Sequence, residues 1–506
     1  MRAYRAVEDL ARRSHRLDHA RAMLKWDEAV MMPAGGSDAR AETLAELAVL
    51  SHENASRPEI PDLIATAWAE LEAAGDDPEV AWMRANLREF EHGWRSEVAL
   101  PADLVARSTR ASVTSEHAWR RLRVENDWEG FRPHLENVLE LKQQEAAIRA
   151  GISGLEPHDA LIELYDPGTR SATLDPVFAD LKAFLPDFIA AVVERQRTEN
   201  VIPLEGPFPI DAQRDLALEM MGHIGFDFSR GRLDVSHHPF CGGAPGDVRI
   251  TTRYNESDFA RSFMAVLHET GHARYEQGRD PDSSGQPATR ARGMGVHESQ
   301  SLFTEMQVAR SPEFLAFAAP IMRRHFRIED DAPGWDADNL HRVYTRVRPG
   351  YIRVDADEAT YPVHVILRYE LEKALLSGDL AVDDLPGAWD EKMRAGLGLA
   401  TGDNHHDGCM QDVHWAAGLF GYFPSYTLGA LIAAQLMATL RREHPSLDDE
   451  VRQGRFENIG AWLERRIWSR GSQLTTPDLL EEATGQALDP QYFKAHLQRR
   501  YLGTEA

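Results

Sequence analysis

Apolar residues recur at three- and four-residue spacing through most of this 506-residue chain. The pattern is clearest in residues 41–53, 133–150 and 175–197, each long enough for several turns of amphipathic helix. Alternating, β-branched stretches are few, and the best is residues 246–254, GDVRITTRY. The sequence therefore predicts a mainly α-helical protein with one small β-sheet.

The segments rich in Gly and Pro are all short, and no internal repeat is visible in the sequence. We therefore expect one continuous domain over residues 1–506, with a helical N-terminal part at about 1–200 and a second part at about 201–506. The alternative is two separate domains, a helical one up to about residue 200 and a catalytic one after it.

The composition is that of a folded globular protein, with 43% hydrophobic and 27% charged residues. Lys and Arg number 56 against 81 Asp and Glu, which gives a formal net charge of −25. Nucleic acid and anionic membrane surfaces would be repelled on average, so neither is expected as a partner. The two cysteines, Cys241 and Cys409, are far apart and indicate no disulfide framework, which suits a reducing compartment.

The chain begins with basic residues but without an apolar run of signal-peptide length. The most apolar segment, residues 426–440, is 15 residues long and contains Gln435, too short and polar to cross about 30 Å of hydrocarbon. We expect a cytoplasmic protein that does not span a membrane.

Residues 266–278, VLHETGHARYEQG, place two histidines four apart with a glutamate directly after the first. Asn255, three residues before Asp258, is the expected N-cap of the surrounding helix, and Gly278 is the expected C-terminal stop. We expect the helix to bury Phe259, Phe263, Val266 and Leu267 along one stripe.

On such a helix His268 and His272 lie one turn apart, and both imidazoles can reach one zinc ion. Glu269 is rotated by about 100° from His268, beside the metal, where it can act as general base on a metal-bound water. The alternative is that the histidines are ordinary helix residues that pair with Glu276 or Glu269.

A catalytic zinc needs a third protein ligand, and Gly278 excludes the metzincin pattern in which a histidine follows six residues after the second. Residues 295–306 predict a second helix that carries Glu298, our choice for the third ligand. Glu305, two turns later, either holds a ligand imidazole or is a solvated helix charge. His297 is either structural or a substrate contact.

With these motifs in place, the sequence resembles the carboxypeptidase Taq type metallocarboxypeptidases, the M32 peptidases, over nearly its whole length. The segments that carry the resemblance occur in order and are residues 24–47, 234–240 (DVSHHPF), 247–254, 268–278, 297–301 (HESQS), 352–380 and 408–429.

The resemblance implies a single large, mainly helical, zincin-like peptidase domain with a small sheet beside a deep active-site groove. It implies a homodimer that releases C-terminal amino acids from peptides with broad specificity. It also implies metal ligands at His268, His272 and Glu298 and a base at Glu269. We expect one divalent ion per chain, zinc, with cobalt as the alternative because these ligand types suit several ions.

A carboxypeptidase must bind a free terminal carboxylate, for which a guanidinium offers a charged, bidentate fork. Arg353 is our first candidate, Arg348 the second and Arg249 the third. The alternative for each is a salt bridge with a nearby acidic residue, Asp355, Asp357 or Asp247.

The strand with Arg249 either pairs with the substrate backbone or is a buried structural strand. Candidate donors to the oxyanion are His414, Tyr422 and Tyr426, although this aromatic segment also has the composition of a packed core. His238 is a candidate for the wall of the groove.

We therefore predict a metal-dependent carboxypeptidase. A zincin-type oligopeptide endopeptidase is the alternative within the same chemistry, and C-terminal amidation of the substrate separates the two. A helical binding protein with a structural metal, or with none, is the alternative from another class, and metal analysis with chelator titration separates it.

Overall fold

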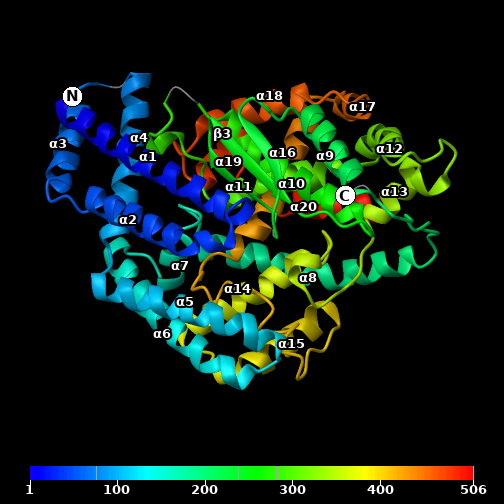
Figure 1. Ribbon diagram of the computed structural model, residues 1–506, viewed down its shortest axis with the longest axis horizontal. Coiled ribbons are helices and arrows are strands. Elements are labelled where there is room, and N and C mark those ends of the chain that lie inside the picture. The colour runs from blue at the N-terminus through cyan, green and yellow to red at the C-terminus, as the bar shows by residue number, and fades with distance from the viewer. Residues whose placement is uncertain (76, 238, 281–282, 505–506) are drawn as a thin grey trace.

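The computed structural model describes residues 1–75, 77–237, 239–280 and 283–504. Most of them lie in helices that surround one small sheet, as Figure 1 shows. The expected fold class, mainly α-helical with a small sheet, is confirmed. His238 lies outside the described residues.

The N-terminal helices occupy the left and lower left of Figure 1. They are α1 (Arg2–Val30), α2 (Ser37–Ala55), α3 (Ile60–Glu72), α4 (Pro78–Val98), α5 (Ala102–Val124) and α6 (Trp128–Ser153). The expected helices at 41–53 and 133–150 lie within α2 and α6. Helices α1, α3 and α4 share a small core of their own, which includes Tyr4, Leu71 and Leu87.

The other helices pack around a main core, which begins in α5 and continues through α6 to the C-terminal helices. They are α7 (Pro157–Ile162), α8 (Ser171–Gln196), α9 (Ile210–Ile224), α10 (Phe259–Gly278), α11 (Met294–Leu302), α12 (Pro312–Phe326), α13 (Ala337–Tyr344), α14 (Tyr361–Ser377), α15 (Leu385–Leu397), α16 (Pro424–Glu443), α17 (Leu447–Arg452), α18 (Glu457–Arg466), α19 (Thr476–Thr484) and α20 (Gln491–Leu497). The expected helix at 175–197 corresponds to α8.

Shorter helical turns join these elements. The 3-10 turns are η1 (Ala34–Gly36), η2 (Pro287–Thr289), η4 (Pro333–Trp335), η5 (Arg353–Asp355), η6 (Val382–Asp384) and η7 (Trp468–Arg470), and the π-helical turns are η3 (Phe303–Ala309) and η8 (Gln498–Leu502). The expected helix at 295–306 is therefore real but changes geometry, because α11 continues into η3.

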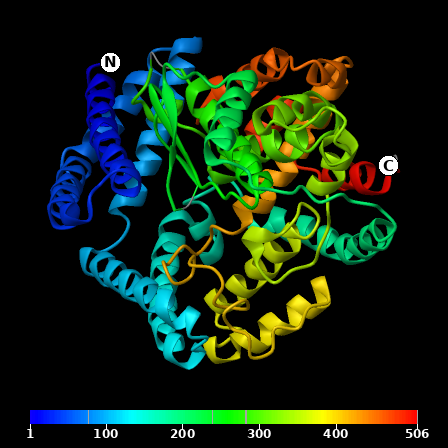
Figure 2. The same ribbon diagram turned by 45° about the vertical axis from the view of Figure 1, so that its right-hand side comes forward.

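The sheet contains β1 (Gly231–Val235), β2 (Phe240–Ala244) and β3 (Asp247–Thr252) in the order β1-β3-β2. Strand β3 pairs in parallel with β1 and antiparallel with β2, so both of its edges are occupied. The idea that the strand of Arg249 pairs with substrate backbone is therefore wrong, and its alternative, a buried structural strand, holds. Figure 2 shows the sheet between the blue N-terminal helices and the green α10.

Val248 and Ile250 of β3 are fully buried against α10, as the alternation predicts. Thr251, on the opposite face, is fully buried as well, so β3 is covered on both sides. This second cover was not expected from the alternating pattern, which is typical of a strand with one solvent-facing side.

Helix α16 contains the most apolar segment of the chain and is buried along almost its whole length. Gln435, the residue that makes this segment too polar for a membrane span, is buried and donates to Thr484 Oγ1 at 3.0 Å. Within the part of the chain that the structure describes, no helix is both long and apolar enough to cross a bilayer.

Glu372 of α14 holds three parts of the core together. Its buried carboxylate accepts from the Trp415 indole at 2.8 Å and from the Gly421 amide at 2.6 Å. It also lies 2.9 Å from His158 Nε2 on α7. A buried acceptor with three partners is costly to remove, because each donor left unsatisfied costs about 1–3 kcal/mol.

We expect Glu372→Ala to lower the free energy of unfolding by about 3–5 kcal/mol, because it removes a buried carboxylate and leaves its partners unpaired. The change is measured by urea unfolding. Glu391→Ala, at an exposed position on α15, is the matched control and should change stability by no more than about 0.5 kcal/mol. Equal stability of the two variants would show that the three contacts contribute nothing.

Candidate metal centre

Helix α10 begins three residues later than expected. Its N-cap is Asp258, whose carboxylate accepts from the Arg261 amide at 3.3 Å. Asn255, the expected N-cap, instead accepts from the Ser257 amide at 2.9 Å and closes a separate turn before the helix. Asn and Asp both favour such local turns, so the sequence alone does not show which of Asn255 and Asp258 caps the helix. Gly278 is the last helical residue, so the helix ends one residue beyond the expected end at Gln277.

The stripe of Phe259, Phe263, Val266 and Leu267 is buried, as expected, and fixes which way α10 faces. On another side of the helix, Gly271 allows α11 to approach. A Cβ atom at Gly271 would lie 2.3 Å from the carbonyl oxygen of Gln300, closer than any real contact. This close approach places α11 beside the two histidines.

His268, His272 and Glu298 converge on one point. Their ligand atoms all lie within 4.8 Å of one another. Glu298 Oε2 is 3.5 Å from His272 Nε2 and 4.0 Å from His268 Nε2. Bonds of 2.0–2.1 Å in a tetrahedral shell require ligand atoms about 3.3 Å apart. The donor set and its spacing therefore fit a divalent ion such as zinc with only small adjustments.

The outer side of the His268 ring is held by a carboxylate. His268 Nδ1 lies 2.9 Å from Glu305 Oε2, and the other Glu305 oxygen accepts from Arg310. Although burial opposes ionisation, Arg310 and His268 hold the pKa of Glu305 down to about 2. Two roles were expected for Glu305. The structure supports the first, in which Glu305 holds a ligand imidazole.

The outer side of the His272 ring is held through a second imidazole. His272 Nδ1 and His297 Nδ1 are 2.6 Å apart, and His297 Nε2 lies 2.9 Å from Glu276 Oε1. Glu276 also pairs with Arg279, which together with His297 lowers the pKa of Glu276 to about 2 against the effect of burial. With an ion at His272 Nε2, the ring proton would lie on Nδ1 and donate to His297, and His297 Nε2 would donate to Glu276.

Glu269 is buried beside this cluster, with 8% of its surface exposed. Burial raises the pKa of its carboxyl to about 7; the His268 charge acts in the opposite sense and the Glu298 charge adds to the rise. A carboxylate in such surroundings is a good proton acceptor near neutral pH.

Arg353 lies in a buried cluster of charges rather than against the expected acidic residues. Its Nε and Nη2 atoms donate to one oxygen of Asp412 at 3.1 and 2.9 Å, and Nη1 donates to Tyr361 Oη at 2.8 Å. Arg368 donates to the other Asp412 oxygen at 2.6 Å. Asp355 pairs instead with Arg261 of α10. Two guanidinium groups thus share one carboxylate.

The three oxyanion candidates form one aromatic cluster with Arg353. The Arg353 guanidinium carbon lies 4.7 Å from the Tyr426 ring centre, and Tyr426 Oη is 3.0 Å from His414 Nε2. The Tyr422 and Tyr426 rings are 5.3 Å apart. Burial raises the pKa of Tyr426 to about 12; the Arg353 charge acts in the opposite sense, and the Glu298 charge adds to the rise. The cluster therefore adjoins the metal-ligand group.

The other two arginine candidates lie in different surroundings. Arg348 is exposed, its backbone amide donates to Asp357 at 2.8 Å, and its guanidinium has no partner among the described residues. Arg249 forms a bidentate pair with Asp247, the expected alternative, and its guanidinium carbon lies 4.4 Å from the Trp26 ring centre on α1. Arg249 thus ties α1 to the sheet.

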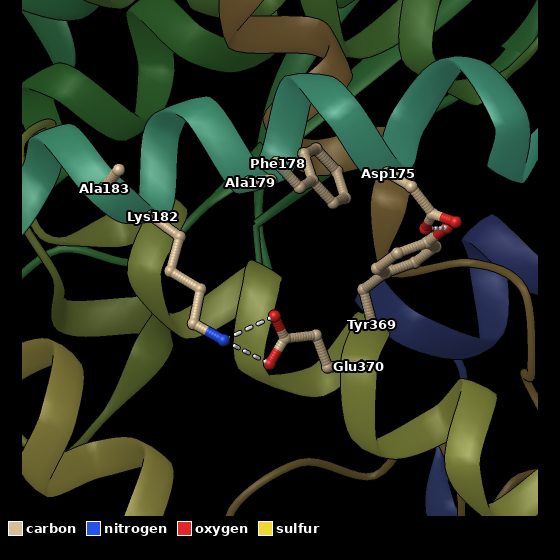
Figure 3. Close-up of a pocket in the computed structure, with 7 residues that line it drawn as sticks. All are labelled: Asp175, Phe178, Ala179, Lys182, Ala183, Tyr369 and Glu370. Atoms are coloured by element: carbon tan, nitrogen blue, oxygen red, sulfur yellow. Dashed lines mark hydrogen bonds and ion pairs between the residues drawn. The ribbon is translucent and has the colours of Figure 1, made fainter.

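A cavity of about 460 Å³ lies elsewhere, between α8 and α14 (Figure 3). Phe178 and Tyr369 form its apolar side, and Lys182 pairs with Glu370 across it at 2.7 Å. None of the metal-ligand group lines this cavity. The cavity is open to solvent and contains an ion pair, without the grouped histidines and carboxylate of the metal-ligand group.

The geometry of two histidines, a glutamate and an adjacent base can now be compared with known proteins. Residues 6–501 match the family model of the carboxypeptidase Taq (M32) metallopeptidases. The chain belongs to this family. It is 37% identical to thermostable carboxypeptidase 1 of Thermus thermophilus, over 99% of this chain and 98% of that one. It is 33% identical to carboxypeptidase 1 of Bacillus subtilis, over 97% of each.

Solved structures of carboxypeptidases have the same fold as this chain. Trypanosoma cruzi metallocarboxypeptidase 1 superposes with a TM-score of 0.96 and 43% identity, over 99% of each chain. The M32 carboxypeptidase of Deinococcus radiodurans superposes with a TM-score of 0.92 and 32% identity, again over 99% of each. This M32 chain is accordingly a metallocarboxypeptidase, which implies peptide substrates and a divalent metal. The expected family and enzyme class are confirmed.

Sequence reasoning missed several residues of the site. Arg310 and Arg279 are two of them. A short spacing could have identified each, because Arg310 follows Glu305 by five residues and Arg279 follows Glu276 by three. Glu276 was considered only as a partner of the histidines in a site without metal. Asp412 and Arg368 were missed because no local spacing links them to Arg353.

We expect His297→Phe to weaken metal binding about 10- to 100-fold, the usual effect of removing a group that holds a ligand imidazole. Phenylalanine keeps the ring that packs beside His272 and Tyr275 but removes both nitrogens. Metal affinity is measured by competition with a chelator. His117→Phe, at an exposed position on α5, is the control. Wild-type affinity in a folded His297→Phe protein would contradict the assignment.

Proposed function

We propose that this chain releases single amino acids from the C-termini of peptides with broad preference, at a metal centre formed by His268, His272 and Glu298. The observation that carries the proposal is the convergence of these three ligand groups with Glu269 buried beside them. Membership in the M32 family supports it independently.

The ion, when bound, supplies a Lewis acid that polarises the scissile carbonyl and makes water more acidic. Glu269 accepts a proton from the water while the water oxygen forms the new bond to the carbonyl carbon. When the C–N bond breaks, Glu269 returns that proton to the leaving amine. Its raised pKa suits both steps, since the carboxyl can hold and release a proton near neutral pH.

Arg353 is our first choice for binding the terminal carboxylate of the substrate. Arg353 and Arg368 carry two positive charges and share Asp412, so one positive charge in the cluster has no counterion within the described part of the chain. A peptide carboxylate would supply it. Two guanidinium hydrogens of Arg353 remain free of the partners described above, which leaves room for a further acceptor. Arg348, which is exposed and whose guanidinium has no partner among the described residues, is the second choice.

Tyr426 is our first choice for a donor to the oxyanion. Its pKa of about 12 keeps the hydroxyl protonated, and burial followed by the Arg353 charge lowers the pKa of His414 to about 3, so the adjacent imidazole is neutral. A neutral hydroxyl beside a positive guanidinium can donate to a developing negative charge. Tyr422 and His414 remain further candidates.

Zinc is the metal we propose, with cobalt as the alternative, because two imidazoles and one carboxylate suit both. We further propose a cytoplasmic homodimer and an active-site groove beside the sheet. The homodimer and the groove come from the family resemblance, and the cytoplasmic location from the two isolated cysteines, which suit a reducing compartment. The alternative activity is that of an oligopeptide endopeptidase, which would not need the terminal carboxylate.

We expect Glu269→Gln to lower kcat at least about 100-fold, because the amide cannot accept a proton, while metal content and thermal stability stay near wild type. Release of C-terminal amino acids from an N-blocked peptide measures activity, and elemental analysis measures the metal. Substantial turnover by a metal-loaded Glu269→Gln protein would contradict the role of this residue as base.

Amidation of the substrate C-terminus should lower kcat/KM at least about 100-fold, since it removes the charge that hydrogen-bonds to arginine, and such bonds contribute about 1.5–3 kcal/mol each. In an Arg353→Lys variant the preference for the free acid should shrink, whereas Arg348→Ala should keep it. The reverse pattern would assign the carboxylate to Arg348. Efficient internal cleavage of amidated peptides would favour the endopeptidase alternative.

A further inference from the structure

The C-terminal helix lies close to the support of the metal centre. Helix α20 packs against α16, and the π-helical turn η8 follows it directly (Figure 1). From η8, Arg500 donates through Nη1 to the Met306 carbonyl oxygen at 2.5 Å and to Glu358 Oε2 at 2.9 Å. Met306 belongs to η3, the turn that presents Glu305 to His268.

The turn η3 needs such support. A π-helix is wider than an α-helix and is found mostly as single turns at functional sites. Glu305 sits in this turn, and its oxygens bind His268 on one side and Arg310 on the other. A displacement of η3 would therefore move the carboxylate that orients the His268 ring.

Glu358 is the anchor for the C-terminal segment. Its carboxylate is fully buried and lies 2.7 Å from His496 Nε2, 2.9 Å from Arg500 Nη1 and 3.0 Å from Tyr501 Oη. Although burial opposes ionisation, Arg500 and His496 hold the pKa of Glu358 far below its usual range. Glu358 also lies between Arg353 and Tyr361 in the chain.

The charges between the C-terminal segment and the metal ligand alternate in sign. Arg500 pairs with Glu358, Glu358 acts electrostatically on Arg310, Arg310 pairs with Glu305, and Glu305 holds His268. Each member is buried or nearly so, and charges in such surroundings interact more strongly than at the surface. Loss of Arg500 would remove the guanidinium that contacts Glu358 and leave His496 and Tyr501 as the other contacts of this carboxylate.

We propose that Arg500 is a positioning residue for the metal centre: by holding the Met306 carbonyl against Glu358, it fixes the turn that presents Glu305 to His268. This inference rests on the proposed metal site. It gives the C-terminal segment a role in metal binding that its distance along the chain from the HExxH motif does not suggest.

The test compares Arg500→Gln with Arg499→Gln, an exposed neighbour on η8. Metal affinity is measured by chelator competition, and the geometry of the site by the visible absorption of the cobalt-substituted protein. Arg500→Gln should weaken metal binding about 3- to 10-fold, less than loss of a direct partner, and should shift the cobalt bands. Arg499→Gln should change neither. A lower melting temperature with wild-type affinity and spectrum would overturn the proposal.

Arg500→Lys provides a second variant if Arg500→Gln does not fold. Lysine keeps the charge beside Glu358, but its ammonium ends one bond short of the position of Arg500 Nη1, the atom that bonds both Glu358 and Met306. It should fold and still bind metal more weakly, and wild-type affinity would again overturn the proposal.

A double-mutant cycle tests the route of the effect. In a Glu305→Gln background, Arg500→Gln should change metal affinity by less than about twofold, because the residue through which it acts has already been altered. An undiminished effect would overturn the proposed route. Wild-type metal stoichiometry is measured first: no bound ion would refute the proposed metal site and this inference together, whereas one ion with unaffected Arg500 variants refutes this inference alone.

Discussion

The close approach of α10, α11 and α16 is the constraint on which the site depends. Gly271 lets the backbone of α11 reach α10, and Gly429 lets α16 approach the stem of Glu298, where a Cβ atom would lie only 2.7 Å from Glu298 Cβ. Asp166 adds a polar link by accepting from the Gly295 amide at 2.7 Å at the start of α11. With these helices in place, the three ligand groups meet without any contribution from a loop, and side chains on helices hold a geometry better than those on loops.

Close packing also creates an electrostatic problem, because it buries several carboxylates near one another. Glu305 and Glu276 would be costly to bury alone, and each has an arginine within five residues of it in the chain. These pairs keep both carboxylates ionised, so that one can accept from His268 and the other from His297. The orientation of both ligand imidazoles is thus a consequence of how the buried charges are compensated.

The sequence predicts those features that depend on local spacing. The helical period and the alternation around Val248 identify the fold class, and the four-residue spacing brings His268 and His272 together. Contacts between distant segments could not be predicted in this way. Asp412 meets Arg353 across 59 residues, and no period in the chain encodes such a pairing. The start of α10 is not where the sequence predicts it, because Asn255 and Asp258, three residues apart, both favour turn geometry.

The buried cluster of Arg353, Arg368 and Asp412 bears on substrate binding, because the net charge of the protein is −25. An overall negative charge repels a peptide carboxylate at a distance, but that field is screened beyond about 8 Å in physiological salt. Within the cluster, Arg353 and Arg368 are almost completely buried and exceed their single counterion Asp412 by one charge. Because screening and dielectric are both low there, the local excess outweighs the distant repulsion. Under the proposed binding of the terminal carboxylate by Arg353, this attraction acts only once the carboxylate has entered the site.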